Sequence, residues 1–323
     1  MIKQANVLIT GGLGAIGSAL CRRLLTSKVE RLVIIDDCSS GDPRLSRDVL
    51  DDPRVTLVRG SVTDEAALER AFAVAPRIVF HLAAHFANQN SVDHPVIDCE
   101  VNSIGTIRML EHARRARVSK FVFASSSCVY GSADSFAVDT RDFRLDTPYA
   151  INKLHGEYLV RFYHEYFGMD TTILRYFNSF GPGELPGLYR NVVPNFFALA
   201  MRGEPLPITG DPNAGRDFTF VGNTVEATLL AAEKPISAGR TYNVGTGMHV
   251  TVGELAEHIN NIAGNTAGTI LKPGRQWDHV FRRVADISRT TEDLQYRPVI
   301  DLPSQLRETY EWLLRHKDSF HAA

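Results

Sequence analysis

The chain has 323 residues, of which 44% are hydrophobic and 22% are charged, with 35 basic and 37 acidic side chains and a net charge of −2. This length predicts one large or two ordinary domains with ample buried core. The near-neutral charge balance argues against a protein that binds nucleic acid or a membrane surface through bulk charge.

The N-terminal segment and the cysteines indicate a cytoplasmic protein. Residues 1–6 lead directly into an apolar segment, unlike a signal peptide. No apolar run reaches the roughly 20 residues of a transmembrane helix. The four cysteines are far apart and lack metal-ligand spacing, so we expect free thiols and no metal site at Cys21, Cys38, Cys99 and Cys128.

Short β-branched runs alternate with helical segments through the first half of the chain. The runs cover residues 7–9, 32–35, 55–58, 78–80, 121–123 and 172–174. Continuous apolar runs of this length are typical of parallel strands buried on both faces. Between the first two runs, Ile16, Leu20 and Leu24 recur at the spacing of one buried helix face. The alternation predicts a doubly wound α/β sheet of the Rossmann type.

The pattern changes after about residue 174, where Pro and Gly become dense between residues 181 and 215. Helices are still indicated by a capping-box pattern over Thr251–Glu254 and by Pro303, which suits the first turn of a helix over 304–316. We therefore predict a Rossmann domain over residues 1–174, with a return of the chain around 217–247. A smaller α/β substrate domain is expected over residues 175–323.

A glycine-rich turn follows the first expected strand and opens the first expected helix. Gly12, Gly14 and Gly17 fit the pattern G-x-G-x-x-G, and Gly11 adds a further glycine. A tight turn, a close approach to a pyrophosphate and close helix–strand packing each require a residue without a side chain. The helix N-terminus also offers free N–H groups to phosphate oxygens. The turn therefore predicts a dinucleotide-binding loop.

An acidic pair ends the second expected strand and selects the dinucleotide. Asp36 lies 19 residues beyond Gly17, where a carboxylate accepts hydrogen bonds from the adenosine ribose and repels a 2′-phosphate. Asp37 follows in a place where a phosphate-binding Arg would favour NADP. The pair predicts NAD as the cofactor.

Residues 147–153 carry the candidate acid/base group. Thr147 suits a helix cap and Pro148 a first helical residue, which places Tyr149 and Lys153 one turn apart on the same face. The ordinary pKa of a phenol is about 10, but an ammonium, a helix N-terminus and a nicotinium ring each favour phenolate. We therefore expect a lowered pKa for Tyr149. A strand ending in Ser125–Ser127 supplies hydroxyls at the edge where such sheets hold their sites.

Together these motifs resemble the extended short-chain dehydrogenases/reductases, and most closely the NAD-dependent nucleotide-sugar 4-epimerases of the UDP-glucose (galactose) type. The resemblance spans nearly the whole chain. It rests on the glycine-rich turn, Asp36, His81–Ala84, Asn102, Ser125-Ser126, Val129–Gly131, Tyr149 with Lys153, and Leu174–Asn178.

The resemblance implies an NAD-dependent enzyme that oxidises the sugar at C4, forms a transient 4-keto sugar, and returns the hydride to its other face. It implies a catalytic trio of Ser126, Tyr149 and Lys153. The cofactor-binding residues that it implies are Gly11, Gly14, Ala15, Ile16, Gly17, Asp36, Asp37, Ser61, Val62, Leu82, Ala83, Ala84, Asn102, Ser125, Tyr149, Lys153 and Tyr176. The substrate-binding residues are Ser126, Asn178, Asn191, Pro207, Thr209, Arg216, Arg275 and Asp278.

The resemblance also implies a homodimer and a nucleotide-sugar partner, whereas the charge balance and the absence of long apolar runs predict neither a nucleic-acid nor a membrane partner. The hexose is left open between glucose/galactose, N-acetyl and uronic acid forms. Uridine diphosphate is the expected nucleotide, and thymidine diphosphate fits the same motifs. Arg282 and Arg283 fall near the hexose pocket of relatives. A surface pair is the simpler interpretation, and an inward-pointing Arg would instead pair with a sugar carboxylate.

Several alternative functions remain, of which the first is another epimerase or a dehydrogenase of the same family. A 4,6-dehydratase needs an added acid and base, which relatives supply as Asp-Glu where this chain has Ser127 and Cys128. A decarboxylase usually keeps Glu at the Cys128 position. A non-catalytic NAD-binding sensor is compatible with the fold, but such a protein should have lost part of the catalytic trio.

Overall fold

A computed structural model describes residues 2–133, 136–140, 142–278 and 280–320. Its central element is a seven-stranded sheet in the order β11-β6-β5-β4-β1-β2-β3, in which every neighbouring pair is parallel. The strands are β1 (Asn6–Thr10), β2 (Arg31–Asp36), β3 (Val55–Arg59), β4 (Ile78–His81), β5 (Lys120–Ser126), β6 (Thr171–Tyr176) and β11 (Arg240–Val244). The predicted doubly wound α/β fold is confirmed.

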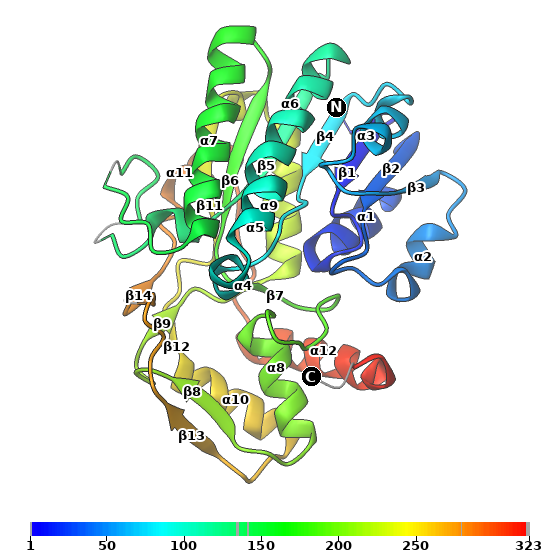
Figure 1. The fold of residues 1–323 in the computed structure, drawn as a ribbon. Helices are drawn as coiled ribbons and strands as arrows, with labels where there is room; N and C mark the ends of the chain where they lie inside the picture. Colours follow the sequence, from blue (N-terminus) through cyan, green and yellow to red (C-terminus); the bar gives the residue numbers. More distant parts are fainter. Residues whose placement is uncertain (1, 134–135, 141, 279, 321–323) are drawn as a thin grey trace.

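Helices cover both faces of the sheet (Figure 1). One face packs against α1 (Ala15–Thr26) and α9 (Val221–Glu233). The opposite face packs against α3 (Glu65–Phe72), α6 (Gly105–Arg115) and α7 (Pro148–Phe167). The remaining helices of this part are α2 (Arg47–Leu50), α4 (Asn88–Asp93), α5 (Pro95–Cys99) and α11 (Ser288–Leu294).

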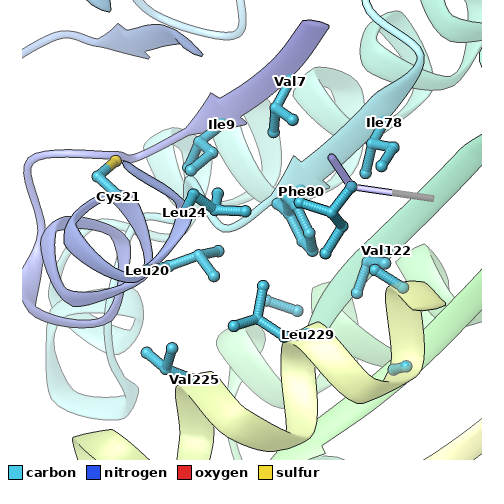
Figure 2. Close-up of a cluster of buried hydrophobic side chains, with 14 of the residues drawn as sticks. Val7, Ile9, Leu20, Cys21, Leu24, Ile78, Phe80, Val122, Val225 and Leu229 are labelled. Carbon is cyan, nitrogen blue, oxygen red and sulfur yellow. The ribbon is translucent and has the colours of Figure 1, made fainter. Parts of the chain in front are cut away.

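The two cores follow from strand alternation, because successive side chains point to opposite faces of a sheet. Val7 and Ile9 of β1 pack with Leu20, Leu24 and Leu229 in the cluster drawn in Figure 2. Leu8 between them belongs to the other cluster, against α3, α6 and α7. Burying one such side chain contributes about 1.5–3 kcal/mol, so β1 is fixed in register at the centre of the sheet.

A second lobe lies beyond the carboxyl ends of the strands (Figure 1). Its core lies among α8 (Val192–Met201), α10 (Val252–Ala263), α12 (Leu302–Arg315) and β8 (Leu206–Thr209). The small strands are β7 (Ser179–Phe180), β9 (Gly215–Arg216), β10 (Thr219–Phe220), β12 (Val250–Thr251), β13 (Thr269–Lys272) and β14 (Arg282–Arg283).

The chain passes between the two lobes more than once. After β9 it returns to the sheet, where α9 packs on α1 and β11 pairs with β6, and it then enters the second lobe again through α10. The predicted capping box is present, with Thr251 and Glu254 each bonding the backbone of the other. The predicted helix at Pro303 begins at Leu302 and is capped by Asp301.

The described residues include no helix with both the length and the apolar character needed to span a membrane. All four cysteines are free thiols, as predicted.

Candidate active site

A cavity of about 1010 Å³ lies at the carboxyl edge of the sheet, between the strands and the second lobe. The sheet order changes direction between β1 and β4, and a crevice opens at such a point because the two connections leave on opposite sides. All the residues predicted to bind cofactor or substrate line this cavity, apart from Asn102. The cavity therefore brings together segments from both lobes.

The glycines of the β1–α1 turn are required for two different reasons. A Cβ on Gly17 would lie 2.1 Å from the carbonyl oxygen of Gly11, so close packing within the protein excludes a side chain there. A Cβ on Gly14 would meet only that same oxygen, at 3.4 Å. Gly14 caps α1 without a side-chain hydrogen bond, and Ala15 and Ile16 follow it along the cavity wall. This leaves room for a pyrophosphate at the positive end of the helix.

Asp36 is held at the end of β2 by two backbone amides. Its Oδ2 accepts a hydrogen bond from Leu13 N at 2.9 Å, and its Oδ1 accepts one from Cys38 N at 2.9 Å. Burial raises the pKa of the carboxyl, and both amides oppose that rise. A carboxylate oxygen has further lone pairs, so Asp36 retains acceptor capacity toward a ribose in the cavity that it lines.

Asn102 is placed differently from the other predicted residues. It is buried at 1% exposure behind the cavity wall, where Asp98 accepts a hydrogen bond from its side-chain amide. That side chain also bonds both backbone groups of His85, which lines the cavity. Asn102 thus positions the wall at His85 rather than lining the cavity, and the resemblance did not imply this arrangement.

Ser126, Tyr149 and Lys153 converge on one end of the cavity. Thr147 caps α7 by accepting a hydrogen bond from Ala150 N at 3.3 Å, as predicted, which fixes Tyr149 in the first turn. Lys153 donates from Nζ to the Ala124 carbonyl at 2.9 Å. Its Nζ lies 5.8 Å from the centre of the Tyr149 ring.

The expected lowering of the Tyr149 pKa is wrong for the protein alone. Burial raises the pKa of the Tyr149 phenol, with Cys128 and Asp98 adding to the rise, and the nearby Ser126 hydroxyl opposes it only in part. Burial likewise lowers the pKa of Lys153 to about 8. Removal from water penalises both charged forms, and it is the largest contribution to the shift of each group. Phenolate would therefore require an additional positive charge beside the ring.

The second lobe supplies further polar groups to the same cavity. Arg216 Nη2 pairs with Asp278 Oδ1 at 3.2 Å. Burial lowers the pKa of Arg216, and Asp278 opposes that shift. Pro207 and Thr209 line the wall from β8. Arg275 is exposed, with its guanidinium 5.5 Å from the centre of the Trp277 ring.

Two predicted asparagines fix loops along the same wall. Asn178 donates to the Asp217 carbonyl at 3.3 Å. Asn191 donates from its backbone and from its side chain to the buried Glu184 carboxylate, at 3.1 Å in each case. Burial raises the pKa of that carboxyl, and the bonds to Asn191 oppose the rise.

Sequence reasoning missed a buried ion pair behind the catalytic strand. Glu157 and Arg175 are both 0% exposed and meet through two hydrogen bonds, at 2.7 and 2.8 Å. The Ser125 hydroxyl donates to the same carboxylate at 2.6 Å. Two signals were available, since Glu157 lies four residues after Lys153 on α7 and Arg175 interrupts an apolar strand.

The two arginines near the hexose position differ from each other. Arg282 is exposed, whereas Arg283 is 8% exposed and lines the cavity. The simpler interpretation, a surface pair, is therefore wrong for Arg283. The alternation of a short strand places the two side chains on opposite sides.

The model of the NAD-dependent epimerase/dehydratase family matches residues 7–245. The chain belongs to this family. Among solved structures it is similar to the epimerase Mth375 of Methanothermobacter thermautotrophicus, with 37% identity, a TM-score of 0.93, and coverage of 98% of this chain and 94% of that one.

Two further similar structures differ in the reaction that they are named for. UDP-glucose 4-epimerase of Thermotoga maritima, solved with UDP-glucose, is 32% identical at a TM-score of 0.90 over 97% of this chain and 99% of that one. The dTDP-glucose 4,6-dehydratase DesIV of Streptomyces venezuelae, solved with NAD, is 26% identical at a TM-score of 0.90 over 98% and 99%.

The cofactor of this family member is NAD, and the residues present fit it. The space beside Gly14 admits a pyrophosphate. Asp36 presents a carboxylate at the ribose position and disfavours a 2′-phosphate.

Proposed function

We propose that the protein is an NAD-dependent nucleotide-sugar 4-epimerase that inverts C4 of a UDP-hexose. The supporting observation is that Ser126, Tyr149 and Lys153 line one cavity. The two residues that follow Ser126 in the chain are Ser127 and Cys128, and both also line this cavity. Elimination of water across C5 and C6 needs an additional acid and base. A hydroxyl and a thiol at those two positions favour epimerisation over dehydration.

The proposed mechanism assigns proton handling to Tyr149. Ser126 and Tyr149 bind the sugar O4, and Tyr149 takes the O4 proton as the C4–H bond breaks, then returns it after the keto sugar has turned. When bound, NAD supplies the hydride acceptor and a positive ring. That ring adds the charge that the buried phenol lacks in the protein alone. Lys153, anchored to the Ala124 carbonyl, holds the nicotinamide ribose.

The substrate diphosphate would be bound by Arg216, whose planar fork suits phosphate oxygens. In the present structure that fork is paired with Asp278, so binding exchanges one anion for another. Pro207 and Thr209 would contact the base, and Asn178 the diphosphate.

We also propose that two copies associate through α6 and α7. Tyr158, Phe162 and Tyr166 on α7 are 56%, 48% and 72% exposed. Phe162 and Tyr166 stack on each other at 5.2 Å between ring centres. Large exposed aromatic groups in one patch are typical of interaction surfaces. Sedimentation of the wild type and of Tyr166→Glu tests this, with a dimer expected only for the wild type.

The direct test of the reaction incubates the purified protein with UDP-glucose, UDP-N-acetylglucosamine, UDP-glucuronate and their dTDP counterparts, without added reductant. NMR and mass spectrometry identify the products. A C4-inverted sugar of unchanged mass supports the proposal, and loss of water or carbon dioxide contradicts it. Tyr149→Phe should lower turnover by about 10²-fold or more while NAD stays bound. A sensor would bind its partners equally well with either residue.

A further inference from the structure

Arg283 carries a buried charge without a counter-charge. It lies in β14, directly opposite Arg216 in the parallel pairing with β9. Arg216 has the carboxylate of Asp278 at 3.2 Å. Arg283 forms no ion pair with any residue that the structure describes, and it is 8% exposed. Asp278, which lines a small pocket together with Arg283, is therefore held by Arg216.

The hydrogen bonds of Arg283 are also incomplete. Its Nη2 donates to the Gly131 carbonyl at 3.1 Å, and its Nη1 has only a weak contact with the Cys128 sulfur at 3.8 Å. Its Nε is buried and has no partner in the described structure. A guanidinium has five N–H donors and no acceptor, and a buried cation without an anion is unfavourable. The side chain is equipped for an anionic ligand.

The contacts of Arg283 place it at the catalytic end of the cavity. Cys128 and Gly131 belong to the segment that directly follows Ser126, and the Cys128 amide donates to the Ser126 hydroxyl at 3.1 Å. If C4 of the sugar reacts at Ser126 and Tyr149, the groups nearest to Arg283 are those on the adjoining ring carbons, C3 and C5. The uronic acids carry an anion there, as the C5 carboxylate.

We propose that Arg283 binds the C5 carboxylate of a nucleotide-linked hexuronic acid, and that this acid is the preferred substrate. The planar fork of Arg matches a carboxylate with two parallel hydrogen bonds. A neutral hydroxymethyl group would leave the buried charge uncompensated. This inference rests on the proposed 4-epimerase function, which places C4 at Tyr149.

Binding measurements by calorimetry on the NAD-bound protein test the assignment. The ligands are UDP-glucuronate, UDP-glucose and UDP, and the proteins are wild type, Arg283→Gln and Arg282→Gln. Arg282→Gln is a matched control, because it removes the same charge from the exposed neighbouring position. We expect the wild type to bind UDP-glucuronate at least about tenfold more tightly than UDP-glucose. Arg283→Gln should lower the affinity for UDP-glucuronate by about 30-fold or more and change the affinity for UDP by less than about threefold.

Each other outcome overturns the assignment. Equal weakening of all three ligands in Arg283→Gln places the side chain on the diphosphate. Unchanged binding of all three means that Arg283 touches no ligand. If Arg283→Gln does not fold, Arg283→Lys serves in its place, because it keeps the charge but lacks the planar fork. Its affinity for UDP-glucuronate should be about tenfold lower than that of the wild type, and its affinity for UDP should be unchanged.

Turnover separates this inference from the proposed function. If UDP-glucuronate binds in an Arg283-dependent way but C4 is not inverted in any sugar, the epimerase proposal fails and the carboxylate site stands. If the wild type inverts UDP-glucose as efficiently as UDP-glucuronate and Arg283→Gln changes neither, the carboxylate site fails and the epimerase stands.

Discussion

The buried pair of Glu157 and Arg175 allows the effect of burial on the strength of an ion pair to be tested at a nearly constant N–O distance. Its N–O distance is 2.7 Å with both side chains 0% exposed. Arg202 and Glu204 meet at a closely similar distance of 2.6 Å, with side chains 55% and 48% exposed. A carboxylate-to-amide change at each glutamate removes the charge with little change in shape. The two substitutions therefore form a matched set that differs in environment.

The expected magnitudes follow from the local dielectric. Charges about 4 Å apart attract by about 4 kcal/mol at an effective dielectric constant of about 20, and by about 1 kcal/mol in water. Removing one partner of a buried pair costs about 3–5 kcal/mol, because the other charge is left desolvated. An exposed pair contributes about 0–1 kcal/mol. We therefore expect Glu157→Gln to lower the free energy of unfolding by about 3–5 kcal/mol, and Glu204→Gln by less than about 1 kcal/mol.

Urea unfolding at pH 7, followed by circular dichroism, measures both values. The double variant Glu157→Gln/Arg175→Met removes both buried charges and should recover part of the loss. The guanidinium that then still lacks its carboxylate is that of Arg161, which pairs with Glu157 at 3.3 Å and is 32% exposed. If Glu157→Gln were as stable as Glu204→Gln, burial would not strengthen this ion pair. If the double variant were less stable than Glu157→Gln, Arg175 would stabilise the fold through packing rather than charge.

Three further predictions concern the cofactor loop and the catalytic lysine. Asp36→Asn should weaken the binding of NAD by about tenfold or more and reduce the preference for NAD over NADP, which titrations with each dinucleotide measure. An unchanged ratio of the two affinities would contradict the contact between Asp36 and the ribose. Gly17→Ala should lower the free energy of unfolding by about 1–3 kcal/mol, since its Cβ would lie 2.1 Å from a carbonyl oxygen. Gly14→Ala should fold normally yet bind NAD more weakly, and equal stability losses at the two glycines would be inconsistent with this difference. Burial lowers the pKa of Lys153 to about 8, so the folded state disfavours its protonated form. The free energy of unfolding of the wild type should therefore rise by about 2 kcal/mol between pH 7.5 and 9.5, relative to that of Lys153→Met. If the two proteins show parallel dependences on pH, burial does not shift the pKa of this lysine.

Local patterns in the sequence were sufficient to predict the sheet and the position of the site. The runs at residues 7–9, 32–35, 55–58, 78–80, 121–123 and 172–174 all lie inside strands of the main sheet. Five of these runs are buried, so hydrophobic pattern and tertiary packing favour the same structure there. The run at 55–58 forms the edge strand β3, where Thr56 is exposed and only Val58 is fully buried. The catalytic helix also begins where Thr147 and Pro148 indicate.

The electrostatics of the site depended on contacts that the sequence does not contain. The expected lowering of the Tyr149 pKa does not hold for the protein without NAD, because spacing on a helix reports proximity to Lys153 but not desolvation. The orientation of Arg283 depends on the pairing of β14 with β9 and on Gly131, which lies 152 residues away in the chain. The partnership of Glu157 with Arg175 likewise joins a helix to a strand.

The central claim is that the hydride removed from C4 returns to C4 of the same sugar. The most direct measurement uses whichever UDP-sugar turns over, labelled with deuterium at C4, and follows the label by NMR and mass spectrometry. We expect deuterium to remain at C4 in both epimers and the mass of the sugar nucleotide not to change. Deuterium at C6 with loss of water, or loss of carbon dioxide from the sugar, would contradict it.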